Sequence, residues 1–300
     1  MCAKQHDAEV ALEMRSGVGE SPVWDDRRGE LLFVDMVRAS VHRFSPATGS
    51  TRSFDVPFPV SCVALRQDDD GLILAGGRSF FVVDRDGAQL SSFGEFRLLA
   101  EDVAFNDGKV DPRGRLVVGS MDERGERPTG ALYMLEADGS VRVLLEQVTI
   151  SNGLAWSLAG DTCYFIDSVC HLVEAFDVDA ESGRLSNRRA VTAIADSVPD
   201  GMAIDAEGLL WVACWGGGRV DRIDPATGTV CETIPLPVSQ VASVAFGGDA
   251  LDQLFITTAR DGLDAGQLEL EDHAGDLFVA IPGARGLPTC RFGLRAEQTR

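Results

Sequence analysis

The feature that most constrains this chain is a pattern that repeats six times along its 300 residues. Each copy contains a polar residue, a short apolar strand, a turn with Asp or Gly, and a second apolar strand. The clearest copy is SVPDGMAIDAEGLLWVAC, from Ser197 to Cys214. The copies begin roughly 40 to 50 residues apart, which is the length of one four-stranded propeller blade. Their opening polar residues are Glu20, Ser61, Asn106, Asn152, Asp200 and Ser243.

A second hairpin pattern follows each copy, as in ALYMLEADGSVRVL and VDRIDPATGTVCET, where turn residues separate two apolar runs. Two hairpins per repeat make four strands. The sequence therefore predicts an all-β fold, a six-bladed β-propeller with four antiparallel strands per blade. We expect AEVALEM, residues 8–14, to supply a strand to the last blade and so close the ring. DAGQLELE is long enough for only a single helical turn.

The repeat favours one domain over residues 1–300, with residues 1–7 disordered ahead of the first strand. A net charge of −20 disfavours nucleic acid and anionic membranes as partners. The seven cysteines contain no C-x-x-C pair, and no apolar stretch is long enough for a membrane helix. We therefore expect a cytoplasmic protein in a reducing compartment. A closed propeller needs no partner subunit, so a monomer is the default expectation.

In a propeller the first strand of every blade lines a central channel, so the opening polar residues of the repeats should form a ring at one mouth. This ring would hold two carboxylates, two amides and two hydroxyls. Oxygen-rich sets of this kind suit one divalent cation, either calcium, magnesium or manganese, and zinc and ferrous iron also accept them. The protein oxygens are too few to fill a coordination shell, so water or substrate should complete it.

Each ring residue also has a simpler interpretation, because Asn-Gly and Pro-Asp-Gly are common turn sequences. The repeat strengthens the metal interpretation, since Glu20, Asn152 and Asp200 occupy equivalent positions in three blades. Glu20 lies in VGESPVW, where a turn is less expected and an unpaired carboxylate would point into the channel. The chain has no G-x-S-x-G elbow, no P-loop and no dinucleotide-binding fingerprint.

Several of these segments together resemble the family of senescence marker protein, gluconolactonase and luciferin-regenerating enzyme, which includes regucalcin. The matching motifs are GESPVW, FNDGKVDPRG, SNGLAWS followed by YFIDS, PDGMAIDAEGLLWVA, and ARDG at Ala259–Gly262. The resemblance spans about residues 16 to 290. It implies a six-bladed propeller with one catalytic divalent metal ion, held here by Glu20, Asn152 and Asp200.

The resemblance further implies that Asn106 contacts substrate and that Asp200 acts as catalytic base as well as metal ligand. Ala104 stands where many family members have arginine, so one expected contact to sugar hydroxyls is missing. The acidic substrate contact of the family falls on Glu123 or has become Arg124. Both differences bear on the choice of substrate and leave the metal ligands unchanged.

The function expected from this resemblance is metal-dependent hydrolysis of sugar aldonolactones, of the gluconolactone, xylonolactone or arabinonolactone type, to aldonic acids. The partner would then be a small-molecule sugar lactone. Two alternatives remain open at this point. One is a metal hydrolase similar to phosphotriesterases or arylesterases, and the other is a calcium-binding regulatory protein without turnover.

Overall fold

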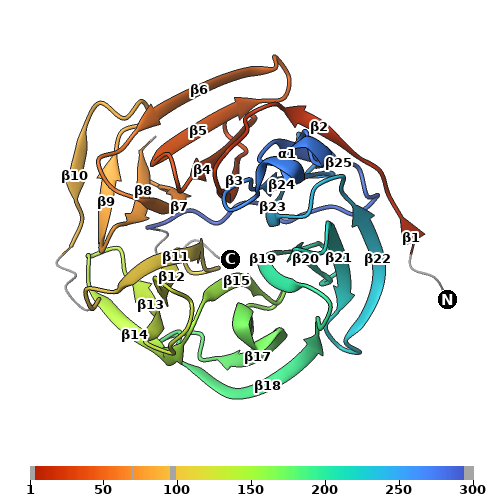
Figure 1. Ribbon diagram of the computed structural model, residues 1–300. Coiled ribbons are helices and arrows are strands. Elements are labelled where there is room, and N and C mark those ends of the chain that lie inside the picture. Colours follow the sequence, from red (N-terminus) through yellow and green to blue (C-terminus); the bar gives the residue numbers. More distant parts are fainter. Residues whose placement is uncertain (1–3, 69–70, 95–98, 294–300) are drawn as a thin grey trace.

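The computed structural model describes residues 4–68, 71–94 and 99–293. These residues form six sheets arranged in a ring around a central axis, and the chain passes through the sheets in order (Figure 1). The first strand of each sheet lies next to the axis, and we call it the inner strand. The prediction of an all-β, six-bladed propeller is confirmed.

Each of the first four blades contains four consecutive antiparallel strands. Blade 1 has β3 (Gly19–Asp25), β4 (Glu30–Asp35), β5 (Ser40–Ser45) and β6 (Ser50–Asp55). Blade 2 has β7 (Val60–Leu65), β8 (Leu72–Gly76), β9 (Ser79–Val83) and β10 (Leu90–Ser92). Blade 3 has β11 (Val103–Val110), β12 (Leu116–Asp122), β13 (Gly130–Leu135) and β14 (Val141–Val148). Blade 4 has β15 (Ser151–Trp156), β16 (Thr162–Asp167), β17 (Leu172–Val178) and β18 (Leu185–Ala193), with a 3₁₀ turn, η1 (Ser168–Cys170), before β17.

The last two blades also recruit strands from the N-terminal end of the chain. Blade 5 has β19 (Val198–Ile204), β20 (Leu210–Trp215), β21 (Arg219–Asp224) and β22 (Thr229–Pro235), and β1 (Lys4–Gln5) adds a fifth strand parallel to β22. Blade 6 has β23 (Val241–Gly247), β24 (Gln253–Thr258), β25 (Leu277–Ala280) and, as its outer strand, β2 (Ala8–Leu12).

The ring is closed by β2, which pairs antiparallel with β25, so the predicted closure by an N-terminal strand is confirmed. Two details differ from expectation. The segment predicted to be disordered, residues 1–7, contains β1 at Lys4–Gln5, and residues 1–3 lie outside the described part of the chain. The last repeat has no second hairpin of its own, because β2 already occupies the edge of β25.

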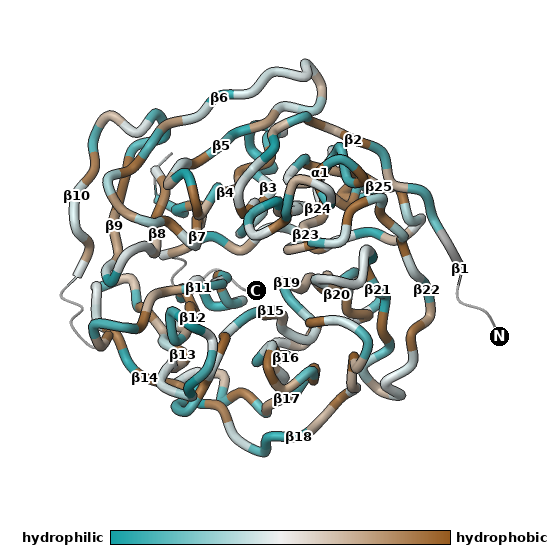
Figure 2. Tube along the Cα trace, in the orientation of Figure 1, coloured by the Kyte–Doolittle hydropathy of each residue, from teal (hydrophilic) through white to brown (hydrophobic). Residues whose placement is uncertain are grey.

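The core lies between neighbouring blades, where strand residues are apolar on both faces of the sheet. The inner and second strands are almost fully buried, whereas the outer strand β6 is mostly exposed and is pale or hydrophilic in Figure 2. Trp24, Trp156 and Trp211 are buried, as expected for residues in repeat strands. This packing makes the inner strands a rigid support for whatever lies at the mouth of the channel.

Helical structure is confined to short pieces. Asp264 caps α1 (Ala265–Leu270), a helix of 6 residues, with a capping box to Gln267, which confirms the single turn expected there. Among the described residues no helix is long and apolar enough to cross a membrane. The six described cysteines are all free.

Candidate metal centre at one mouth of the channel

All six inner strands break register with their second strand near the same level, close to the ring residues. The shifts lie between Glu20 and Val23, Val60 and Cys62, Phe105 and Gly108, Asn152 and Leu154, Pro199 and Met202, and Val241 and Ser243. A β-bulge redirects side chains and is common beside functional sites. The sixfold bulge explains how consecutive polar residues can turn toward the channel from otherwise apolar strands.

The predicted residues are brought to this one mouth, and they lie in strands rather than in turns. Glu20, Asn152 and Asp200 are buried, with exposed fractions of 6 to 7%, and Asn106 is 9% exposed. The turn interpretation of Asn-Gly and Pro-Asp-Gly is therefore wrong at these positions. The glycines that follow Asn152 and Asp200 instead allow neighbouring blades to pack closely.

Two of these glycines contact the next blade directly. A Cβ on Gly153 would lie 2.7 Å from the backbone oxygen of Asp200, and a Cβ on Gly201 would lie 2.1 Å from Oγ of Ser243. Both distances are far below an ordinary van der Waals contact. Any side chain larger than hydrogen at either position would push the inner strands apart and widen the ring.

Each of the three carboxylates Glu20, Asp107 and Asp200 is held by the backbone N–H of the residue that follows it. The N–H of Ser21 donates to Oε2 of Glu20 at 2.8 Å, and the N–H of Gly108 donates to Oδ1 of Asp107 at 2.7 Å. Asp200 accepts from the backbone in the same way. Ser21 adopts a positive φ of 51°, an uncommon conformation that the bulge at Glu20 requires.

A chain of hydrogen bonds links the amides of Asn106 and Asn152. Nδ2 of Asn106 donates to Oδ1 of Asn152 at 3.0 Å and to the backbone oxygen of Ser151 at 2.8 Å. Nδ2 of Asn152 donates to Oγ of Ser168 at 2.8 Å, and that hydroxyl donates to the oxygen of Pro199 at 2.7 Å. Both side chains are thereby fixed across blades 3, 4 and 5.

Sequence reasoning missed Asp107 and Lys109, which lie beside these residues in the channel. The signal was present in FNDGKV, where charged residues interrupt a strand that is otherwise apolar. Nζ of Lys109 donates to the backbone oxygen of Met202 at 2.5 Å, so the lysine crosses from blade 3 to blade 5. Lys109 is the positive charge that the structure places among the three carboxylates.

Burial controls the protonation of this cluster. Burial, together with the charge of Asp107, raises the pKa of Glu20 from 4.5 to about 8. Burial and the charges of Glu20 and Asp107 raise the pKa of Asp200 well above its usual value. Burial also raises the pKa of Asp107 and lowers the pKa of Lys109. The raised pKa of each carboxylate means that the cluster has too little positive charge nearby to stabilise the ionised forms.

This donor set fits a divalent cation. A bound cation would supply the positive charge that the buried carboxylates need, and oxygen donors from carboxylates and amides suit hard metals. Among the described residues, no three Asp, Glu, His or Cys side chains converge as a metal site by themselves. The candidate set is accordingly mixed, with Glu20 and Asp200 as carboxylates and Asn152 as an amide.

The positions expected to bear on the choice of substrate, Ala104 and either Glu123 or Arg124, lie in β11 and directly after β12 of blade 3. Ala104 pairs with Met121 on the second strand of blade 3, so the wall beside Asn106 is apolar at this point. Glu123 is exposed, and its carboxylate lies 3.9 Å from the guanidinium of Arg78 in blade 2. An arginine is thus present near the mouth, supplied by a neighbouring blade.

Comparisons with known proteins agree with this architecture. Residues 18–260 match the family model described as SMP-30/Gluconolactonase/LRE-like region. Rabbit (Oryctolagus cuniculus) regucalcin is 40% identical over 288 residues, covering 93% of this chain and 96% of that protein. A luciferin-regenerating enzyme has a similar structure, with a TM-score of 0.89, 31% identity, and coverage of 95% of this chain and 98% of that chain.

A second solved structure is a protein from Agrobacterium tumefaciens described as a calcium-binding protein, regucalcin. Its TM-score is 0.90 at 25% identity, and the match covers 97% of this chain and 99% of that chain. The agreement therefore extends over nearly the whole propeller. The family match, the identity to regucalcin and the shared fold together establish that this chain belongs to the SMP-30/gluconolactonase/LRE-like family.

Proposed function

We propose that the protein is a metal-dependent lactonase that hydrolyses sugar aldonolactones, of the gluconolactone, xylonolactone or arabinonolactone type, to aldonic acids. One divalent cation, either calcium, zinc, manganese, magnesium or ferrous iron, would be held by Glu20, Asn152 and Asp200. The observation that carries the proposal is the burial of two carboxylates beside an ordered amide at one mouth of the channel. Membership of a family named partly for gluconolactonase supports the lactone as substrate.

The cation, when bound, would act as a Lewis acid and stabilise the negative charge that develops on the lactone carbonyl oxygen. Asp200 is the proposed base, because a bound cation would keep its buried carboxylate ionised and therefore able to accept a proton. It takes a proton from the water whose oxygen attacks the carbonyl carbon. It returns that proton to the ring oxygen as the ring C–O bond breaks, which yields the hydroxy acid.

Asn106 is the proposed substrate contact, and the structure limits what it can offer. Both N–H bonds of its amide are used by Ser151 and Asn152, so only Oδ1 is free to face a ligand. Asn106 would therefore accept a hydrogen bond from a substrate hydroxyl or from the attacking water. This role requires a donor on the ligand, which a polyhydroxylated lactone has.

Hydrolysis measured with a pH indicator tests the proposal. Gluconolactone, xylonolactone, arabinonolactone and galactonolactone would be assayed after chelation and after return of each cation. We expect activity to vanish with the chelator and to return with at least one ion. No hydrolysis of any lactone by the metal-loaded protein would refute the lactonase proposal, and hydrolysis of an organophosphate or aryl ester instead would identify a related esterase.

A calcium-binding protein without turnover is the second candidate. It is supported by the description of the Agrobacterium tumefaciens relative as a calcium-binding protein. The same assay separates the two functions, since a regulatory protein would bind calcium at this mouth and hydrolyse none of the substrates. Calorimetric titration with calcium, compared between the wild type and Glu20→Gln, would locate the binding.

We also propose that the protein acts as a cytoplasmic monomer with a small-molecule partner. All six cysteines within the described part of the chain are free, which supports a reducing compartment, and there the closure of the ring by β2 leaves no blade incomplete. Light scattering coupled to gel filtration would test the monomer. A mass of twice the chain mass of 32.1 kDa would contradict it.

A further inference from the structure

A cavity of about 270 Å³ lies in the channel beside the ring of polar residues, with Ser21, Asp107 and Ser243 among its lining residues. Its walls come from the later residues of the inner strands, and none of the three proposed metal ligands lines it. Three aromatic residues, Trp24, Trp156 and Phe246, are among the lining residues. The cavity therefore adjoins the candidate metal centre, but its walls are largely apolar.

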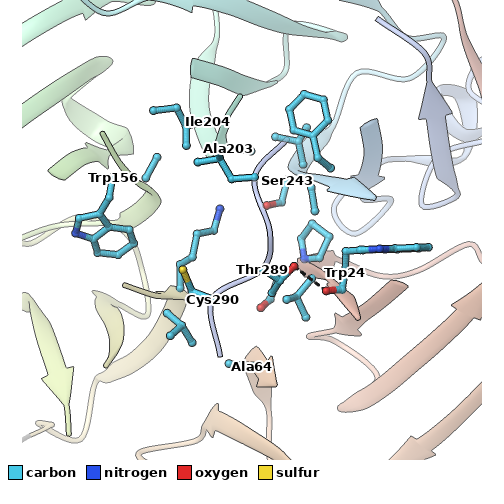
Figure 3. A pocket seen from close by; sticks show the side chains of 18 of the residues that line it. Trp24, Ala64, Trp156, Ala203, Ile204, Ser243, Thr289 and Cys290 are labelled. Atoms are coloured by element: carbon cyan, nitrogen blue, oxygen red, sulfur yellow. Dashed lines mark hydrogen bonds between the residues drawn. The ribbon is translucent and has the colours of Figure 1, made fainter. Parts of the chain in front are cut away.

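One wall of this cavity is the segment Leu287–Cys290, which follows blade 6 and crosses the channel. Figure 3 shows Thr289 and Cys290 on this segment, between Trp156 on one side and Trp24 on the other. The hydroxyl of Thr289 donates to the backbone oxygen of Trp24 at 2.7 Å, and the N–H of Phe292 donates to the oxygen of Leu65 at 2.8 Å. These contacts hold the wall in place, so the cavity is preformed.

Asp107 and Lys109 provide polar groups among the apolar walls. Nζ of Lys109 makes one hydrogen bond, to the backbone oxygen of Met202, and an ammonium has three N–H bonds to offer. Asp107 uses Oδ1 to accept from Gly108. Within the described chain no hydrogen bond or ion pair joins Lys109 directly to Asp107, although their opposite charges act on each other. The ammonium of Lys109, a donor, and the carboxylate of Asp107, an acceptor, thus lie near each other without a direct hydrogen bond.

We propose that this cavity is a second binding site, distinct from the metal centre, for a small neutral apolar molecule that carries one hydroxyl group, such as an alkylphenol. A hydroxyl can donate to the carboxylate of Asp107 and accept from the ammonium of Lys109 at the same time. A ligand carboxylate would be attracted to Lys109 but repelled by Asp107, and a ligand amine the reverse, so neither satisfies both groups as a hydroxyl does. A cavity of about 150 Å³ holds benzene, so this larger one accommodates a phenol with a short alkyl chain.

Calorimetric titration of the metal-loaded protein with three probes tests the class of ligand. The probes are 4-propylphenol, its methyl ether 4-propylanisole, which accepts but does not donate, and the anion 4-propylbenzoate. We expect 4-propylphenol to bind at least about tenfold more tightly than either of the others, because only its hydroxyl satisfies both polar groups. Equal binding of the phenol and the ether would overturn the proposal, as would no binding of the phenol at millimolar concentration.

Two variants test the location. Ala245→Leu fills part of the cavity from its wall, and Ala226→Leu makes the same change on an exposed turn of blade 5. We expect the first to weaken phenol binding by at least about tenfold and the second to leave it unchanged. Asp107→Leu should retain the apolar walls but remove the preference for phenol over ether, because the ether lacks only the proton that the phenol donates to this carboxylate. Phenol binding that Ala245→Leu does not affect would place the ligand elsewhere.

Fluorine NMR of the 5-fluorotryptophan-labelled protein separates this site from the metal centre. Trp156 lines the cavity, whereas Trp215 lies at the opposite mouth, paired with Val198. We expect 4-propylphenol to shift the Trp156 signal and to leave the Trp215 signal in place. Displacement of the phenol by excess lactone, or a shift confined to Trp215, would show that the phenol occupies the metal centre. The measurement needs no turnover, so its outcome is independent of the proposed lactonase activity.

Discussion

The amide of Asn106 donates to Oδ1 of Asn152 at 3.0 Å, and this hydrogen bond joins blade 3 to blade 4 at the candidate metal centre. It connects the proposed substrate contact to a proposed metal ligand. A ligand that displaces the side chain of Asn106 would therefore also shift the side chain of Asn152. Because Ser168 holds the other end of Asn152, the pair belongs to one fixed network that spans three blades.

Replacing Asn106 with alanine should therefore impair both substrate use and metal binding. Oδ1 of Asn152 would lose its donor, and loss of one partner in a buried hydrogen bond costs about 1 to 3 kcal/mol. We expect kcat/KM for the best lactone to fall by about 10- to 100-fold, with weaker metal binding in calorimetric titration. Ser168→Ala, which removes the opposite support, should weaken metal binding while leaving Asn106 in place. Unchanged metal affinity in both variants would contradict the network.

Asp200→Asn tests the proposed base. Loss of a general base lowers rates by about 10²- to 10⁴-fold, so kcat should fall by this factor even at saturating metal. Asp249→Asn, the same change on an exposed turn, is the control and should retain wild-type activity. Near wild-type kcat in Asp200→Asn, measured with each cation at saturation, would mean that another group accepts the proton.

Removal of the metal should make stability depend on pH through Glu20. The pKa of Glu20 is raised from 4.5 to about 8, chiefly by burial, so the folded chain keeps this proton to a higher pH than the unfolded chain does. The chelated protein should therefore lose stability as pH rises from about 4.5 to about 8. Thermal unfolding across this range measures the effect. Glu20→Gln should reduce the dependence to the part that Asp107 and Asp200 contribute, whereas Glu13→Gln, at an exposed position, should leave it intact.

Gly201→Ala tests the close approach of blades 5 and 6. The new Cβ would lie 2.1 Å from Oγ and 2.7 Å from Cα of Ser243, so the inner strands must move apart. Overpacking of this kind costs about 1 to 3 kcal/mol, which urea unfolding would measure. Gly266→Ala is the matched control, because its Cβ meets only Oδ1 of Asp264 at 3.4 Å within α1. We expect that change to be neutral or to stabilise by up to about 1 kcal/mol.

Asp25 anchors the C-terminal segment, and its protonation should contribute to acid unfolding. Burial opposes its ionisation, but the hydrogen bond from Arg291 and the charges of Arg85, Arg291 and Arg28 outweigh burial and lower its pKa below 3.8. The stability that it contributes is present above pH 3.8 and is lost as pH falls through the lower, folded value. Acid titration followed by circular dichroism would show this loss in the wild type.

Asp25→Asn removes the carboxylate that accepts from Arg291 at 2.7 Å and from Arg85 at 2.8 Å. Breaking such a buried pair costs about 3 to 5 kcal/mol, so the melting temperature should fall at neutral pH. Asp26→Asn is the control, because Asp26 also contacts Arg291 but is 51% exposed. Its cost should stay below about 1 kcal/mol. Equal effects of the two variants would contradict the assigned role of Asp25.

The blade architecture could be predicted from the sequence because each blade is built from local patterns. Apolar runs, turn residues and their regular spacing specify strands and hairpins without reference to distant residues. The same registry identified Glu20, Asn152 and Asp200, since equivalent positions in a symmetric fold converge on its axis. A turn was the simpler alternative for Asn-Gly and Pro-Asp-Gly, and the close packing that these glycines allow depends on the neighbouring blade.

Only the tertiary structure decided how segments that lie far apart in the chain meet. The bulge between Phe105 and Gly108 brings Asp107 and Lys109 into the channel, and hydropathy does not reveal such a shift in register. The segment Leu287–Cys290 crosses the channel and does not pair with β25, whose edge is occupied by β2 from the N-terminal side. Local patterns specify which strands form, whereas competition among strands and close packing of blades determine which side chains meet, because those energies depend on non-local contacts.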